Sequence, residues 1–158
     1  MAKLSKKYAD KSRCNNFGEY IYFSEVQAEH SPRIKFYGGT SETRATTSAP
    51  SYTITRNGVG QLELESWMPK KNCPNAFDDE YLAGVKSFIN SHIAILLLVW
   101  FRRLDEADGL AYFVGLADLT QLIFNIDCDD SLLADAADID NEEELHKFCL
   151  DNNLYTFK

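Results

Sequence analysis

The chain has 158 residues, of which 45% are hydrophobic and 25% charged, which predicts one folded domain and excludes an intrinsically disordered chain. Its formal net charge of −8 disfavours general binding to nucleic acid, because phosphate groups repel an acidic surface. The charge is uneven: residues 1–71 hold 11 Lys/Arg against 7 Asp/Glu, whereas residues 72–158 hold 5 against 17.

The cellular compartment is indicated by the cysteines and by the N-terminal sequence. The four cysteines show no C-x-x-C pair and no spacing typical of zinc ligands, so free thiols in a reducing cytoplasm explain them most simply. The N-terminal residues lack the apolar run of a secretory signal. The apolar run at 93–101 is nine residues long, too short for a membrane-spanning helix, which needs about 20. We therefore expect a cytoplasmic protein without a membrane segment.

The first half of the chain predicts a sheet. Residues 1–13 are rich in lysine and predict a loose basic arm. Residues 17–66 predict a small antiparallel sheet, with aromatic and β-branched strands at 18–26 and 33–37 and a hairpin at 51–66. The loop at 38–50 is rich in Gly, Ser and Thr and unusually long for a small domain.

The hairpin turn contains Asn57-Gly58, a dipeptide typical of two-residue turns. A two-residue turn would place the apolar residues of the two strands on opposite faces. A three-residue loop from Asn57 to Val59 restores one apolar face, and it predicts these pairs: Ile54 with Leu62 and Tyr52 with Leu64.

The second half predicts helices. Acidic residues at 78–80 and two arginines near the end favour one long helix over about 78–103, with apolar residues at helical spacing along it. The remainder, 105–158, predicts short helices in an acidic C-terminal part. Strands followed by helices give an α+β fold in which the sheet packs on the long helix, and the whole chain 1–158 forms a single domain.

An apolar patch on the second half of this long helix suggests a homodimer. Leu97, Leu98 and Phe101, with Ala94, continue a helix face that is polar in the first half. An exposed patch there would mark an interface with a second copy. The alternative is that residues 105–126 fold back over it.

The candidate partner-binding residues lie on the second predicted strand and before it. Arg33, Lys35 and Tyr37 alternate with apolar residues, and His30 precedes them. These side chains could hold an anion or an acidic partner. The alternative is an ordinary solvent-exposed strand face whose cations pair with Glu63 and Glu65 across the sheet.

No catalytic, cofactor or metal site is predicted. The three histidines lie far apart in sequence, none of the cysteines belongs to a Cys/His motif, and no phosphate-binding or hydrolase motif occurs. His92 falls on the apolar side of the long helix and is expected to be a hydrogen-bonded core residue. The acidic run at 127–138 partly fits calcium-ligand spacing, but Leu132 replaces the required Gly, so we interpret it as a solvated linker.

Two segments, FGEYIYFSEVQAEHSPRIKFYGG and VKSFINSHIAILLLVWF, resemble a small bacterial family of uncharacterised domains over about residues 17–101. That family has a Pro-Pro-His-x-His strand and a helix ending in Trp, and its members occur in toxin–antitoxin-like gene pairs. The resemblance implies a binding or regulatory role. Arg33 and Lys35 stand where the paired histidines would fall, and Ser31-Pro32 replaces the double proline, so any chemistry of those histidines does not carry over.

The sequence therefore favours a non-enzymatic protein-interaction or regulatory module from a bacterium or its mobile elements. Its partner would be another protein, bound through the strand residues above or through the acidic segment 127–144. The alternative is a nucleic-acid-acting, RNA-directed toxin that uses a basic N-terminal face, with His30 as an acid or base.

Overall fold

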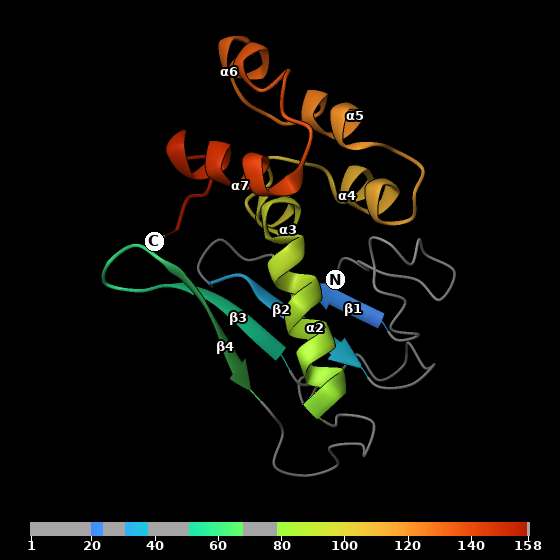
Figure 1. Ribbon diagram of the computed structural model, residues 1–158, viewed down its shortest axis with the longest axis vertical. Coiled ribbons are helices and arrows are strands. Elements are labelled where there is room, and N and C mark those ends of the chain that lie inside the picture. The colour runs from blue at the N-terminus through green and yellow to red at the C-terminus, as the bar shows by residue number, and fades with distance from the viewer. Residues whose placement is uncertain (1–19, 24–30, 38–50, 68–78, 158) are drawn as a thin grey trace.

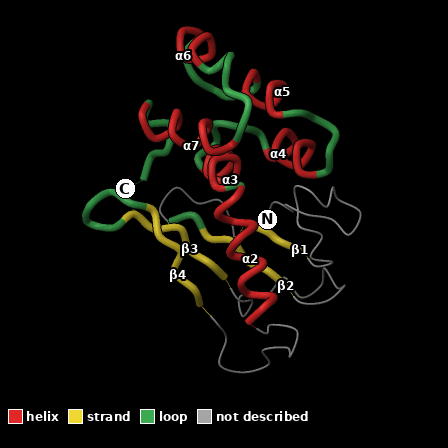
Figure 2. Tube along the Cα trace, viewed as in Figure 1, coloured by secondary structure: helices red, strands yellow, loops and turns green. Residues whose placement is uncertain are grey.

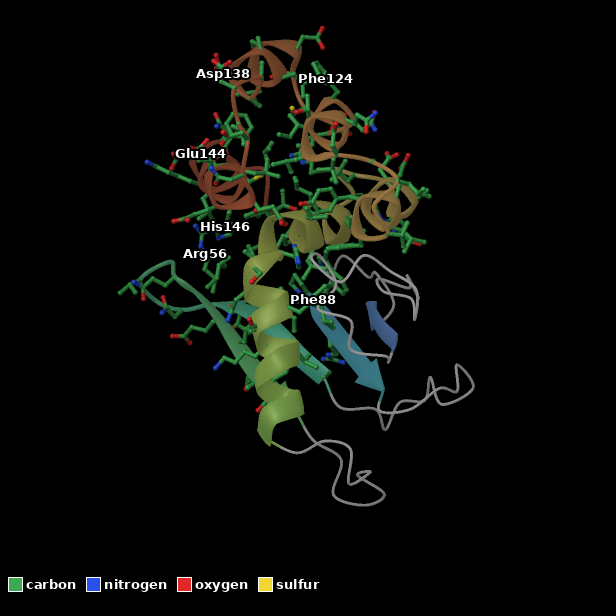
Figure 3. All side chains as sticks on the ribbon, turned by 45° about the vertical axis from the view of Figure 1, so that its right-hand side comes forward. Arg56, Phe88, Phe124, Asp138, Glu144 and His146 are labelled. Carbon is green, nitrogen blue, oxygen red and sulfur yellow. The ribbon has the colours of Figure 1, made fainter. Side chains whose placement is uncertain are left out.

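The computed structural model describes residues 20–23, 31–37, 51–67 and 79–157. Four strands form one antiparallel sheet in the order β1 (Tyr20–Phe23), β2 (Arg33–Tyr37), β3 (Ser51–Arg56) and β4 (Leu62–Trp67). Along the described part of the chain the helices follow the strands (Figure 1), which confirms the predicted α+β class. Helix α2 (Asp79–Ser91) lies across one face of the sheet, and the remaining helices gather beyond one end of it (Figures 1 and 3).

The sheet buries one face because apolar side chains alternate along its strands. Ile34 lies opposite Tyr52 and Ile54 lies opposite Leu64. Ile34 and Ile54 are fully buried in the same core cluster as Phe88 of α2, whereas Arg33 is exposed. The period of two therefore gives this part of the sheet one core face and one outer face.

The hairpin between β3 and β4 has a longer turn than predicted. Arg56 pairs with Leu62, so five residues, 57–61, connect the strands, and Ile54 pairs with Leu64 instead of Leu62. The predicted pairs are wrong by two residues, but the apolar residues still share one face, because a shift by two preserves the alternation.

The side chain of Asn57 explains the wider turn. Its Oδ1 accepts hydrogen bonds from the backbone N–H groups of Val59 (3.0 Å) and Gln61 (2.9 Å), and its Nδ2 donates to Glu63 (3.0 Å). Gly60 has a φ of +83°, a conformation that glycine adopts without a steric penalty. A side chain that bonds its own following backbone thus replaces the tight turn typical of Asn-Gly.

The predicted long helix is two helices. Helix α2 ends at Ser91, and α3 (Ile93–Trp100) follows at an angle of 73°. Seven of the eight residues of α3 are buried, so this helix needs neighbours on all sides, which the sheet alone cannot provide. The bend at His92 carries α3 off the sheet and into the C-terminal helices (Figure 2).

Helix α3 ends at Trp100, earlier than the end near residue 103 that we predicted from the two arginines. Arg102 adopts a φ of +59°, and the N–H groups of Arg102 and Arg103 donate to the carbonyls of Val99 (3.1 Å) and Leu98 (2.8 Å). These two bonds form a Schellman motif, which reverses the chain after the helix. Within the described ranges, no single helix is long and apolar enough to cross a membrane; α2 and α3 meet those criteria only as a bent pair.

The C-terminal part contains four short helices. They are α4 (Glu106–Phe113), α5 (Leu119–Phe124), α6 (Asp130–Asp135) and α7 (Glu142–Asp151). Helix α5 starts at a capping box formed by Asp118 and Gln121, and the side chain of Asn141 caps α7 by accepting from the N–H of Glu144. Short helices therefore occupy the acidic C-terminal part of the chain.

The apolar patch predicted as a homodimer surface is covered within the chain. Leu97 and Leu98 have no exposed surface, because α3 packs against α4 and α7. Phe101 is half-buried, and its ring centroid lies 6.2 Å from that of Tyr155 and 5.0 Å from that of Phe157. Leu97 and Leu98 therefore do not form an exposed patch, because the segment expected to fold back, α7 and the C-terminal residues cover them. A homodimer stays a prediction.

Candidate functional site

The predicted strand residues are only partly described. Arg33 is exposed at the start of β2, an inner strand, and lies opposite Thr53. The backbone of Lys35 pairs with Tyr22 and Ser51, and that of Tyr37 pairs with Tyr20. His30 lies outside the described residues. This candidate site stays a prediction, since the side chains of Lys35 and Tyr37 also lie outside what the structure describes.

The cross-strand charge match also changes in the observed register. Thr53 lies between Arg33 and Glu65, so these two charged residues are separated by a whole strand. Neighbouring strands lie roughly 5 Å apart, so Arg33 and Glu65 are two strands apart and are not direct cross-strand neighbours. Among the described residues, Arg33 therefore lies opposite Thr53 and not opposite a carboxylate.

The acidic segment occupies the far end of the helical part. Its exposed carboxylates, which we call the acidic surface, lie on α6, on the first turn of α7 and on the loops that flank them: Asp127, Asp129, Asp130, Asp135, Asp138, Asp140, Glu143 and Glu144. Figure 3 shows Asp138 and Glu144 along the same side of this end. The only Lys or Arg between residues 104 and 157 is Lys147.

Part of this acidity has a local structural cause. Glu142, Glu143 and Glu144 form the first turn of α7, where negative charge is favoured by the helix dipole. Asp130 lies in the first turn of α6 and has the same explanation. In the described part of the chain, neither Asp130 nor the other five aspartates of the acidic surface forms an ion pair with a cation.

Beneath this surface, a buried polar cluster joins the α2–α3 bend to α7. The Nδ1 atom of His92 lies 2.9 Å from both carboxylate oxygens of Glu142, and the hydroxyl of Tyr112 donates to the same carboxylate at 3.0 Å. The ring centroids of Phe88 and Phe113 lie 4.9 and 5.2 Å from that of the imidazole. His92 is thus a hydrogen-bonded core residue, as predicted, and its enclosure indicates a structural role.

The partner of His92 could not be identified from the sequence. Glu142 lies in the acidic segment 127–144, and it is 50 residues away from His92 along the chain. The only available signal was that a buried histidine requires a polar partner.

A second polar cluster lies at the end of α7. His146 Nδ1 is 2.9 Å from the hydroxyl of Tyr155, and burial lowers the pKa of His146. Burial raises the pKa of the Cys149 thiol to about 12 and also raises the pKa of Tyr155. Because the thiolate is the reactive form of cysteine, Cys149 is unsuited to act as a nucleophile near neutral pH. The pKa of the half-buried Cys128 is likewise raised, mainly by burial.

A small apolar groove lies between α5 and α6. It is shallow, with room for little more than one water molecule. Its walls, which define the α5–α6 groove, are Thr120, Ile123, Phe124, Leu133, Ala136, Ala137 and Ile139. The side chain of Phe124 is 64% exposed at its edge.

The described residues contain no group of His, Cys, Asp or Glu side chains arranged to hold a metal ion. Helix α6 spans Asp130–Asp135, so this part of the acidic run is helical and does not form the ligand loop of an EF-hand. The described carboxylates are therefore best treated as a charged surface.

Comparison with known proteins adds no family. No protein-family model matches the chain, and neither a curated protein nor a solved structure matches it significantly.

Proposed function

We propose that this protein is a non-enzymatic protein-interaction module whose acidic surface binds a basic surface of another protein. The observation that carries the proposal is the separation of charge: residues 104–145 contain 13 Asp/Glu and no Lys, Arg or His. Eight carboxylates of the acidic surface are exposed around one end of the fold.

Electrostatics supports a basic partner. Like charges within a Debye length, about 8–10 Å at physiological salt, repel one another, and this repulsion destabilises the free protein. A partner that brings Lys or Arg side chains to the acidic surface relieves the repulsion and is attracted at long range. Nucleic acid has the same sign of charge as this surface and is disfavoured there.

The proposed module is a regulatory protein of the bacterial cytoplasm. The resemblance of residues 17–101 to domains from toxin–antitoxin-like pairs supports such a role, as does the lack of an activated thiol among the described cysteines. A basic partner that normally binds nucleic acid would suit the acidic surface, because carboxylates can take the places of phosphates.

Affinity capture with charge variants tests this proposal. The wild-type chain and the variant Asp135→Asn/Asp138→Asn/Asp140→Asn are used as baits, with nuclease present and over a range of salt concentrations. We expect a protein partner whose retention falls with rising salt and is lost with the triple variant. The partner is then purified and its Kd for both baits is measured.

The matched control removes three carboxylates elsewhere. Glu63→Gln/Glu65→Gln/Glu106→Gln changes the net charge by the same amount at exposed positions outside the acidic surface. Equal loss of the partner with both triple variants would contradict a local site. A bait with Arg33→Glu tests the strand surface: loss of the partner only with this variant would place the interaction there and overturn the acidic site.

A further inference from the structure

Strand β4 forms one edge of the described sheet. It borders β3 alone in the order β1-β2-β3-β4, and Figure 1 shows it on the side of the sheet away from β1. An edge strand presents a row of backbone N–H and C=O groups that can pair with a strand of another chain. We call the side of β4 that faces away from β3 the β4 edge.

The register identifies the backbone groups that point to the β4 edge. The N–H of Asn57 donates to the carbonyl of Gln61 (2.9 Å), and hydrogen-bonded pairs alternate with non-hydrogen-bonded pairs along an antiparallel ladder. The N–H of Ile54 agrees with this alternation, because it donates away from β4 to the carbonyl of Pro32 (2.8 Å). Every second residue of β4 therefore points its N–H and C=O groups to the β4 edge. These residues are Leu62, Leu64 and Ser66.

The two faces of β4 differ in chemistry. On the core face, Leu62 and Leu64 are only half-buried, whereas Ile54 on the neighbouring strand is fully buried. On the outer face, Glu63 and Glu65 are exposed. An added strand extends both faces, so apolar side chains on it cover the two leucines and the alternate side chains lie beside the two glutamates. Lys or Arg at these alternate positions complements the carboxylates.

The same pattern disfavours a second copy of this chain as the occupant. If two β4 strands paired with Leu64 opposite Leu64, Glu63 of one copy would lie opposite Glu65 of the other. Like charges directly opposite one another destabilise a strand pair, and charged residues on edge strands prevent self-association in this way. The charges therefore point to a different chain with the opposite charge pattern.

We propose that the β4 edge binds an extended segment of another protein, in which apolar residues alternate with Lys or Arg, as an added antiparallel strand. The residue opposite Leu64 exchanges both backbone hydrogen bonds with it and packs beside the leucines. The neighbours of that residue place their cations beside Glu63 and Glu65. This edge contains none of the residues of the acidic surface, so the inference goes beyond the proposed function.

Peptides that differ only in the position of one N-methyl group test the backbone hydrogen bonds. Each has about eight residues, alternates Val with Lys and is blocked at both ends. With Val opposite Leu64, the N–H of each Val faces β4 and the N–H of each Lys points away. N-methylation of a central Val should weaken binding to the full chain about tenfold, whereas N-methylation of a central Lys should leave Kd nearly unchanged. Isothermal titration calorimetry measures these values.

Variants of the protein locate the bound peptide. Ser66 is exposed and its N–H points to the β4 edge, so Ser66→Pro removes an edge donor and leaves the bonds to β3 in place. We expect Ser66→Pro to weaken binding of the Val/Lys peptide about tenfold and Ser66→Ala to have little effect. Glu63→Lys/Glu65→Lys should reverse the charge preference, so that a Val/Glu peptide binds more tightly than the Val/Lys peptide. Circular dichroism confirms that each variant is folded.

Hydrogen exchange of the wild-type protein gives a readout that needs no variant. The bound Val/Lys peptide should slow exchange of the amide protons of Leu62, Leu64 and Ser66, because they enter new hydrogen bonds. Unchanged exchange at these three amides would overturn the β4 edge as the binding site. Equal weakening by N-methylation at Val and at Lys, or no binding of the unmodified peptide, would also overturn it.

The outcomes separate this inference from the proposed function. The Asp135→Asn/Asp138→Asn/Asp140→Asn variant should bind the Val/Lys peptide as tightly as the wild type does. Loss of the peptide with this variant alone would overturn the β4 edge and support the acidic surface. In the affinity capture, a partner of the acidic surface stays bound to the Glu63→Gln/Glu65→Gln/Glu106→Gln bait, because the two surfaces share no residue.

Discussion

The Glu142 carboxylate accepts a hydrogen bond from the hydroxyl of Tyr112 and also contacts the imidazole of His92. The first turn of α7 is therefore linked to the bend between α2 and α3. The imidazole Nδ1 lies 2.9 Å from both Glu142 oxygens, while only 5% of the His92 residue is exposed. This contact links the sheet-covering helix to the helical end that carries the acidic surface.

Removal of this carboxylate should destabilise the fold. Glu142→Ala deprives the buried His92 and Tyr112 side chains of this partner, and a buried polar group that loses its partner costs about 1–3 kcal/mol. We expect the free energy of unfolding in urea to fall by about this amount. Glu143→Ala, an exposed change in the same helical turn, should cost well under 1 kcal/mol. Similar losses for the two variants would show that the cluster does not stabilise the fold.

Gly109 should be required where α4 approaches α3. A Cβ atom at this position would lie 2.8 Å from Cγ2 of Val99, which is closer than real contacts allow. Overpacking typically costs about 1–3 kcal/mol, which exceeds the gain of about 1 kcal/mol from replacing Gly by Ala in a helix. We expect Gly109→Ala to lower the melting temperature.

The double variant Gly109→Ala/Val99→Ala tests the cause of this loss. Removal of the two Val99 methyl groups makes room for the new Cβ, so the combined loss should be smaller than the sum of the two single losses. Additive losses would mean that the steric contact with Val99 is not responsible.

The two glycines of the β3–β4 turn should respond differently to the same substitution. Gly60 has a φ of +83°, a region that costs an L-residue such as Ala roughly 1–2 kcal/mol, whereas a Cβ on Gly58 would meet nothing within 4 Å. We expect Gly60→Ala to lower the free energy of unfolding by about 1 kcal/mol and Gly58→Ala to leave it nearly unchanged. Equal changes in the free energy of unfolding would contradict the observed turn, in which Gly60 has the left-handed conformation.

Stability should fall in alkaline solution because of Cys149. The unfolded thiol ionises near its ordinary pKa of 9.0, whereas the folded thiol keeps its proton up to about 12. Between these values the unfolded state binds fewer protons than the native state, so the free energy of unfolding falls as pH rises, by up to about 1.4 kcal/mol per pH unit. Tyr155 acts in the same direction above pH 10, because its pKa is also raised.

Thermal denaturation between pH 8 and 10 measures this effect. Cys149→Ala should be less stable at pH 8 because a buried side chain is shortened, but its melting temperature should fall less steeply with pH than that of the wild type. Cys128→Ala, at a half-buried position, should change the slope less. Iodoacetamide should modify Cys149 only after unfolding, and rapid modification in the native state would contradict its burial.

The sequence could reveal the acidic surface but not the groove between α5 and α6. The acidity of residues 127–144 is a property of composition, so it was visible before the structure, and the exposure of eight of its carboxylates follows from their charge. The groove between α5 and α6 was not predicted, because its walls come from two short helices and a loop whose packing has no local signature.

The sequence by itself determined those features that depend only on residues close together along the chain. The period of two placed Tyr52, Ile54 and Leu64 on one face of a hairpin, and the order of strands and helices gave the α+β class. Chain-wide charge separation was likewise a sequence property.

Only the tertiary structure decided the features that depend on distant partners. A continuous apolar pattern over 78–103 is compatible with a straight helix, whereas the structure bends the chain at His92, whose partner Glu142 lies 50 residues later. Leu97 and Leu98 looked available in sequence because their cover, α4 and α7, lies further along the chain. Periodicity reports which face of an element is apolar, but the free energy of packing alone selects which element buries that face.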